Sequence, residues 1–90
     1  MNLKILQIRA SKQYIKSFRK LPGQVQALLV EREKIYTADP FDSRLKTHRL
    51  SEKLSHVWSY SIDYHYRILY KFIGKQEALY LDEGTHEVYR

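Results

Sequence analysis

The stretch Val57–Asp82, VWSYSIDYHYRILYKFIGKQEALYLD, decides the fold, because hydrophobic side chains recur at every second position near its start. This period is typical of a β-strand with one buried face. The apolar members of that first strand are Trp58, Tyr60 and Ile62. The polar members, on the opposite face, are Ser59, Ser61 and Asp63. Further strands are predicted at 66–73 and 77–82, on either side of the turn signal Gly74-Lys75. The stretch should therefore form an antiparallel meander.

The residues before this stretch predict one strand and two helices. Residues 3–9 are apolar and rich in β-formers, which favours a strand. Ser11 is a good N-cap for a helix that ends at Pro22, because proline cannot continue the hydrogen-bond ladder. A second helix is expected over 23–36. The order β-α-α-β-β-β predicts a single α+β domain over 1–90, in which an antiparallel sheet packs against an N-terminal helical hairpin.

The second helix should turn one apolar face toward the sheet. Helical spacing places on this face Val25, Leu28, Leu29 and Ile35. Arg32 falls on the same face, where its aliphatic stem can lie along the apolar side chains.

Composition excludes several classes of protein. The chain has 90 residues and no cysteine, so it offers no disulfide, no thiolate metal site and no thiol nucleophile. A secreted domain of this size would usually need such cross-links. No apolar run approaches the length of a membrane span, and the start of the chain lacks a signal-peptide pattern. A cytoplasmic protein without a membrane partner is expected.

The charge points to a polyanionic partner. Sixteen Lys and Arg against ten Asp and Glu give a formal charge of +6, which suits nucleic acid or an acidic protein segment. The alternative is that the charge serves solubility alone. Residues 41–55 have no sustained periodicity and resemble a long loop, which in a small domain is often functional. This segment holds the basic residues Arg44, Lys46, Arg49 and Lys53. Their clustering favours a binding surface.

The histidines are the side chains best suited to proton transfer near neutral pH. They are His48, His56, His65 and His86. Their spacing matches no metal-binding motif, and the chain has only three glycines and no phosphate-binding glycine loop. Neither a metal nor an organic cofactor is expected.

Cleavage of RNA needs little more than a base, a fixed cation and an acid, because the 2′-hydroxyl of the substrate is itself the nucleophile. His48, Arg67 and His86 are residues of the right types, and arginine can grip phosphate oxygens in two places. Each also has a simpler interpretation. A loop histidine can be merely solvated, and Arg67 can face either solvent or a bound anion.

Four segments of the sequence resemble the RelE/ParE toxin superfamily. They are His48-Arg49-Leu50, Trp58-Ser59-Tyr60-Ser61-Ile62, Tyr66-Arg67-Ile68-Leu69-Tyr70 and Gly84-Thr85-His86-Glu87-Val88-Tyr89. The sequence looks most similar to the YafQ and YoeB-like branches. The resemblance implies a RelE-like fold and the toxin of a type II toxin–antitoxin system. Such toxins cleave mRNA in the ribosomal A site without a metal, and an antitoxin encoded in the same operon neutralises them.

The resemblance also implies roles for individual residues. Arg67 matches the arginine that contacts the scissile phosphate, and His86 matches the acid/base histidine of the Gly-Thr-His motif. His48 corresponds to the acid/base residue in the loop before the meander. Tyr89 matches an aromatic residue near the C-terminus that helps to hold the RNA.

The sequence departs from the family at several of the family's site positions. Ser59 and Ser61 stand where the RelE branch carries lysines, so charge stabilisation must come from Arg67 and from Arg49 or Lys46. The YafQ branch has a histidine where this chain has Ile62 and an acidic residue where it has Tyr66; nearby Asp63 or His65 could substitute.

Two other functions remain open on the sequence. A ParE-type inhibitor of DNA gyrase has the same fold and no nuclease activity, but that group generally lacks the two histidines found here at positions 48 and 86. A DNA-binding corepressor that acts only with its antitoxin would show salt-sensitive binding and no cleavage.

Overall fold

The computed structural model describes residues 4–50 and 56–85 of the chain. The elements in chain order are β1 (Gln7–Ala10), α1 (Lys12–Arg19), α2 (Gly23–Ala38), the 3₁₀ turn η1 (Ser43–Leu45), β2 (His48–Arg49), β3 (Trp58–Ser61), β4 (Arg67–Gly74) and β5 (Glu77–Gly84). Within the described ranges, neither helix is both long and apolar enough to cross a membrane.

The strands form one sheet in the order β1-β5-β4-β3-β2. The α+β class and the predicted order of the elements are confirmed, including the antiparallel β3-β4-β5 meander. The sheet as a whole is mixed, because β1 pairs parallel to β5. Alternation along the chain carries no signal for the direction of a distant partner, so the sequence did not reveal this pairing. The strand predicted at 3–9 is observed at 7–10, since Ile5 and Leu6 instead donate hydrogen bonds to Thr37 and Gln76.

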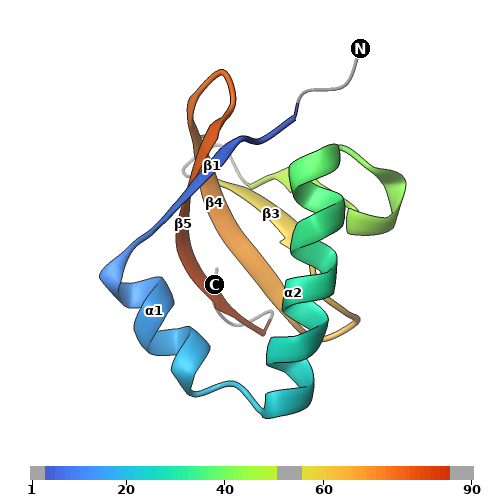
Figure 1. Ribbon diagram of the computed structural model, residues 1–90. Helices are drawn as coiled ribbons and strands as arrows, with labels where there is room; N and C mark the ends of the chain where they lie inside the picture. Colours follow the sequence, from blue (N-terminus) through green and yellow to red (C-terminus); the bar gives the residue numbers. More distant parts are fainter. Residues whose placement is uncertain (1–3, 51–55, 86–90) are drawn as a thin grey trace.

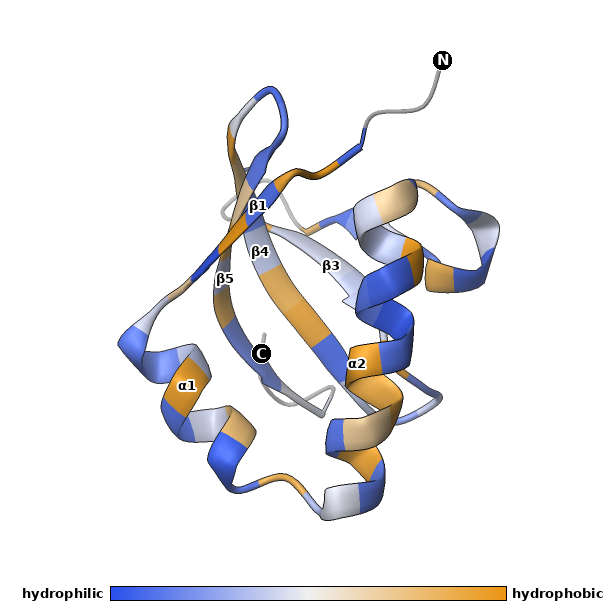
Figure 2. Ribbon diagram, viewed as in Figure 1, coloured by the Kyte–Doolittle hydropathy of each residue, from blue (hydrophilic) through white to orange (hydrophobic). Residues whose placement is uncertain are grey.

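Both helices cover the same face of the sheet, with α1 beside β5 and α2 toward β3 (Figure 1). The core between these layers is built largely from tyrosine. Four rings are at most 1% exposed: Tyr36, Tyr60, Tyr70 and Tyr80. Tyr36 stacks on Tyr60 with ring centroids 4.6 Å apart, and the Tyr60 and Tyr80 hydroxyls lie 2.7 Å apart. Figure 2 shows the hydrophobic middle of β4 in the space between α1 and α2. Amphipathic rings suit such a core, because they bury their faces and can pair their hydroxyls, as Tyr60 and Tyr80 do.

The sheet face opposite the helices is less open than the alternation in β3 predicted. Ser59 and Ser61 were expected to be exposed, yet they are only 0% and 7% exposed. Leu69, which pairs with Ser59 and shares its face, is also buried. Alternation tells which residues share a face but not whether that face is covered, which explains the difference.

Residues 41–50, expected to be loop, contain two short elements. The Asp42 side chain caps η1 by accepting a hydrogen bond of 2.9 Å from the Arg44 backbone N–H. Leu45 is fully buried, and β2 then pairs antiparallel with β3. A two-residue strand is too short to leave a periodic pattern, so sequence reasoning missed it.

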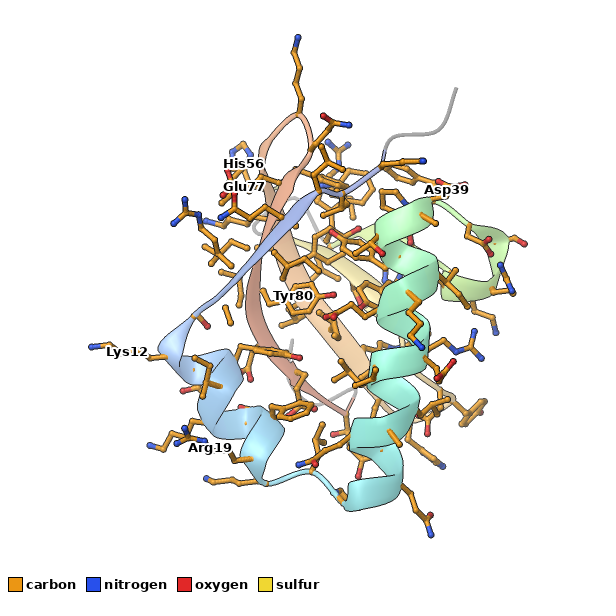
Figure 3. The ribbon with its side chains drawn as sticks, in the orientation of Figure 1. Lys12, Arg19, Asp39, His56, Glu77 and Tyr80 are labelled. Atoms are coloured by element: carbon orange, nitrogen blue, oxygen red, sulfur yellow. The ribbon has the colours of Figure 1, made fainter. Side chains whose placement is uncertain are left out.

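The N-cap of α1 ties that helix to the sheet. The Ser11 hydroxyl oxygen accepts a hydrogen bond of 3.0 Å from Tyr14 N–H and donates one of 2.7 Å to the Leu81 carbonyl. We expect Ser11→Ala to lower the free energy of unfolding by roughly 1–2 kcal/mol, because both bonds are lost. Urea denaturation measures this. Lys12→Ala, at an exposed position of the same turn (Figure 3), should change it by less than about 0.5 kcal/mol. Equal effects of the two substitutions would show that the cap is unimportant.

Candidate functional site

Arg67 lies at the start of β4, between two neighbouring strands. It pairs with Ser61 on β3 and with Gly84 on β5. Its guanidinium Nη1 donates a hydrogen bond to the Ser61 hydroxyl, and the residue is half-buried. The guanidinium is therefore held by the sheet rather than extended freely into solvent, as a group that must hold an anion in a fixed position requires.

His48 lies on the edge strand β2 and is exposed. It pairs directly with Ser59, and residues two apart in a strand share a face, so His48 and Arg67 lie on the same face of the sheet. Two strand spacings and two residues separate their Cα atoms by about 12 Å. The long arginine side chain can reach across most of this distance, so that one phosphodiester can lie between its guanidinium and the imidazole.

A hydrogen bond fixes the tautomer of His48. Its Nδ1 lies 3.0 Å from the carbonyl oxygen of Lys46. A carbonyl can only accept, so Nδ1 carries the proton, and in the neutral ring Nε2 keeps the lone pair. The exposed nitrogen is thus in the state that a general base needs.

Three residues predicted for the site lie outside the described residues: Lys53, His86 and Tyr89. Their roles stay predictions. Gly84, two positions before His86 in the sequence, pairs with Arg67.

The basic residues predicted as one cluster are divided between two places. Arg44 and Lys46 line a pocket of about 240 Å³ together with Arg67. Arg49 follows His48 in β2 and so points to the other face, where its guanidinium carbon lies 6.0 Å from the centre of the Trp58 ring. Of the two residues expected to support Arg67, the structure brings Lys46 near it and places Arg49 on the opposite face.

The pocket also contains residues that sequence reasoning did not assign to the site. Its full lining is Arg32, Arg44, Lys46, Ser61, Ile62, Asp63, Tyr64 and Arg67. Helical spacing placed Arg32 on the apolar face of α2, but its Nη1 donates to the Arg44 carbonyl at 3.5 Å and the side chain lines the pocket. No local pattern could reveal this, because the contact joins α2 to a turn twelve residues later.

Arg44 is partly neutralised within the pocket wall. Its guanidinium forms two hydrogen bonds of 2.9 Å to the carboxylate of Asp42. These bonds, with the backbone N–H bond of Arg44, lower the pKa of Asp42 to about 2. Asp42 is therefore ionised at neutral pH, and the Arg44 charge is shared between this pair and the pocket.

The remaining described histidines do not line the pocket. His56 precedes β3 and is exposed, and His65 is exposed in the turn between β3 and β4. Asp63, in the same turn, accepts backbone hydrogen bonds from His65 and Tyr66, so its role here is to shape the turn. Across residues 4–50 and 56–85, no three His, Cys, Asp or Glu side chains gather in a group that could hold a metal ion.

No protein-family model and no curated protein sequence matches the chain. Solved structures do. A chain of the toxin–antitoxin complex RelBE2 from Mycobacterium tuberculosis matches with a TM-score of 0.78 at 20% identity, covering 94% of this chain and 95% of the other. The YoeB/ParE toxin of Agrobacterium tumefaciens matches with a TM-score of 0.75 at 13% identity, covering 90% and 99%. YafQ of Escherichia coli matches with a TM-score of 0.68 at 15% identity, covering 91% and 94%.

These structures share the whole architecture at low sequence identity, so they establish the fold. The sequence motifs around His48, Arg67 and His86 predicted the same superfamily. The chain has the fold of the RelE/ParE toxin superfamily.

Proposed function

We propose that the chain is the toxin of a type II toxin–antitoxin system and an endoribonuclease that cleaves mRNA without a metal, on the ribosome. The observation that carries this proposal is the placement of His48 and Arg67 on one face of the sheet, with Gly84 of the Gly-Thr-His motif paired to Arg67. The solved relatives include the toxins RelE, YafQ and YoeB. Their names support the role as a toxin.

In the proposed reaction, His48 is the general base. Its Nε2 removes the proton of the 2′-hydroxyl, and the resulting oxygen attacks the adjacent phosphorus. The bond from phosphorus to the 5′-oxygen breaks, and His86 donates a proton to that oxygen. The products are a 2′,3′-cyclic phosphate and a 5′-hydroxyl. His48 takes up one proton and His86 gives up another, so the protons balance, and the exchange of one P–O bond for another changes no oxidation state.

Arg67 stabilises the phosphorane through its planar fork, which contacts two non-bridging oxygens while Ser61 holds the guanidinium in place. The lysines of the RelE branch are absent. Arg32 and Lys46 in the adjoining pocket supply positive charge in their place.

The partner that silences the toxin is proposed to be an antitoxin with an acidic toxin-binding segment. The formal charge of +6 favours such a segment. The solved relatives include three toxin–antitoxin complexes: RelBE2 of Mycobacterium tuberculosis, RelE-RelB of Pyrococcus horikoshii and DinJ-YafQ of Escherichia coli.

Replacing His48 by glutamine tests the proposal. We expect the variant to cleave mRNA on translating ribosomes roughly 10²–10⁴-fold more slowly, because the amide cannot accept the 2′-hydroxyl proton. Gel analysis of end-labelled mRNA measures the rate. His56→Ala, which changes an exposed histidine outside the site, is the control and should cleave at the rate of the unmodified protein. Gyrase-dependent DNA breaks without any RNA cleavage would instead identify a ParE-type gyrase inhibitor.

A further inference from the structure

The pocket beside Arg67 has an unusual concentration of positive charge. Three separate elements contribute its four cations: α2 gives Arg32, η1 and its C-cap give Arg44 and Lys46, and β4 gives Arg67. Asp42 offsets part of the Arg44 charge. Asp63 is the one carboxylate in the lining, and its Oδ1 accepts two backbone N–H bonds of 2.8 and 2.7 Å. Like charges gathered around a hollow repel one another, and a bound anion would offset that repulsion.

The backbone of Lys46 is also held in an unfavourable conformation. Its φ is 51°, in the left-handed region that residues other than glycine rarely adopt. Such a conformation is unfavourable for a residue with a Cβ, which crowds the following carbonyl oxygen. It places the lysine at the C-terminal end of η1, where the side chain lines the pocket and the carbonyl accepts from His48. Lys46 therefore contacts both the pocket and His48, the proposed general base.

An exposed aromatic ring stands at the rim of the pocket. Tyr64, in the turn between β3 and β4, is 83% exposed although it lines the pocket. Its ring meets that of His65 edge to face, with centroids 5.2 Å apart. Exposed aromatic rings beside cations form the usual binding platform for single-stranded nucleic acid, because every base has a face on which a ring can stack.

We propose that this pocket is a nucleotide subsite for the RNA residue that adjoins the scissile phosphate. Arg32 and Lys46 contact the phosphate of that nucleotide, and Tyr64 stacks on its base. Arg67 lines the pocket and also lies on the sheet face that it shares with His48. The subsite and the cleaved bond therefore lie on either side of the Arg67 side chain. The inference rests on the proposed function in one respect: the nucleotide bound here is the neighbour of the scissile phosphate only if the protein cleaves RNA. Binding of a nucleotide in the pocket does not require that cleavage occurs.

Binding and cleavage are therefore measured separately. Binding is followed by fluorescence anisotropy with a short single-stranded RNA that is 2′-O-methylated throughout, which removes the nucleophile and prevents cleavage. We expect Arg32→Gln to flatten the slope of log K against log salt by about 0.7, the value for one phosphate contact on a single strand. The matched control is Arg19→Gln on α1, which points away from α2 (Figure 3) and should leave the slope unchanged.

The tyrosine provides an independent readout. Tyr64→Ala should weaken binding roughly 5- to 150-fold, the loss expected for one stacked base. Tyr64→Phe keeps the ring and should bind like the unmodified protein. Both changes fall at an exposed position, so the fold is expected to survive them.

The outcomes separate the two proposals. If the protein cleaves RNA but Arg32→Gln and Tyr64→Ala bind the methylated RNA like Arg19→Gln, the subsite is wrong and the nuclease stands. If the variants bind more weakly but no RNA is cleaved, the subsite stands and the nuclease is wrong. Variants that keep RNA binding and lose only affinity for an acidic antitoxin would assign the pocket to the protein partner and overturn the subsite.

Discussion

Arg67→Ala is expected to slow RNA cleavage roughly 10²–10³-fold, the loss typical of removing one group that stabilises transition-state charge. Alanine removes both the fork on the phosphate and the bond to Ser61. The single-turnover rate at saturating ribosome-bound mRNA measures the effect, because it excludes product release. Cells that express the variant without an antitoxin should also grow.

Arg67→Lys distinguishes the shape of the group from its charge. Lysine keeps a positive charge but presents a single ammonium, so it cannot hold two phosphate oxygens as arginine does. We expect only partial recovery of the rate. A thermal melt establishes that both variants are folded, and Arg19→Ala on the far side of α1 is the control for lost charge. Unimpaired cleavage by folded Arg67→Ala would remove this residue from the mechanism.

Glu83→Gln is expected to stabilise the protein at pH 8 and to leave its stability nearly unchanged at pH 4. Glu83 is 5% exposed on β5, and its Oε2 has no hydrogen-bond partner among the described residues. Burial, and then the charge of Asp82, raises its pKa from 4.5 to about 7. Tyr14 on α1 is close enough that Glu83, after burial and Glu33, helps to raise its pKa, and this neutral phenol supplies no positive charge to Glu83.

The direction of this change in stability with pH follows from the linkage between proton binding and folding. Because the pKa of Glu83 is higher in the folded state, the folded protein binds more protons than the unfolded chain between about pH 4.5 and 7. The free energy of unfolding therefore falls as the pH rises through this range and levels off above it. The full loss is about 3 kcal/mol at most, and glutamine, which does not ionise, should remove it.

Urea denaturation at pH 4, 6 and 8 measures this difference between Glu83→Gln and the unmodified protein. The comparison cancels the titration of the histidines, which both proteins share. Glu31→Gln, on the exposed side of α2 in a weak ion pair with Lys34, should show no such pH dependence. A difference for Glu83→Gln that stays constant across the three pH values would mean that Glu83 ionises normally.

Local signals predicted the fold well. The alternation around Tyr60 gave β3, and Ser11 caps α1 through the bond to Tyr14 that its residue type predicted. The failures concern partners that are distant in the sequence. The parallel pairing of β1 with β5 and the burial of Ser59 depend on which elements meet in space, and a period of two does not encode that.

The candidate site was predictable to a similar degree. Residue types and motifs singled out His48 and Arg67, and the register places both on one sheet face. Arg49 follows His48 in β2, a strand that the sequence did not predict, and so lies on the opposite face of the sheet. Arg32 and Tyr64 had no signal of their own, because a charged residue on a helix and a tyrosine in a turn are ordinary surface residues until a pocket joins them.

The chemistry of the RNA ends tests the central claim most directly. Mass spectrometry of the fragments released from ribosome-bound mRNA reports which oxygen attacked the phosphorus. Attack by the 2′-hydroxyl with His48 as base predicts an upstream fragment ending in a 2′,3′-cyclic phosphate and a downstream fragment starting with a 5′-hydroxyl. An upstream 3′-hydroxyl with a downstream 5′-phosphate would mean that water was the nucleophile, and would contradict the mechanism.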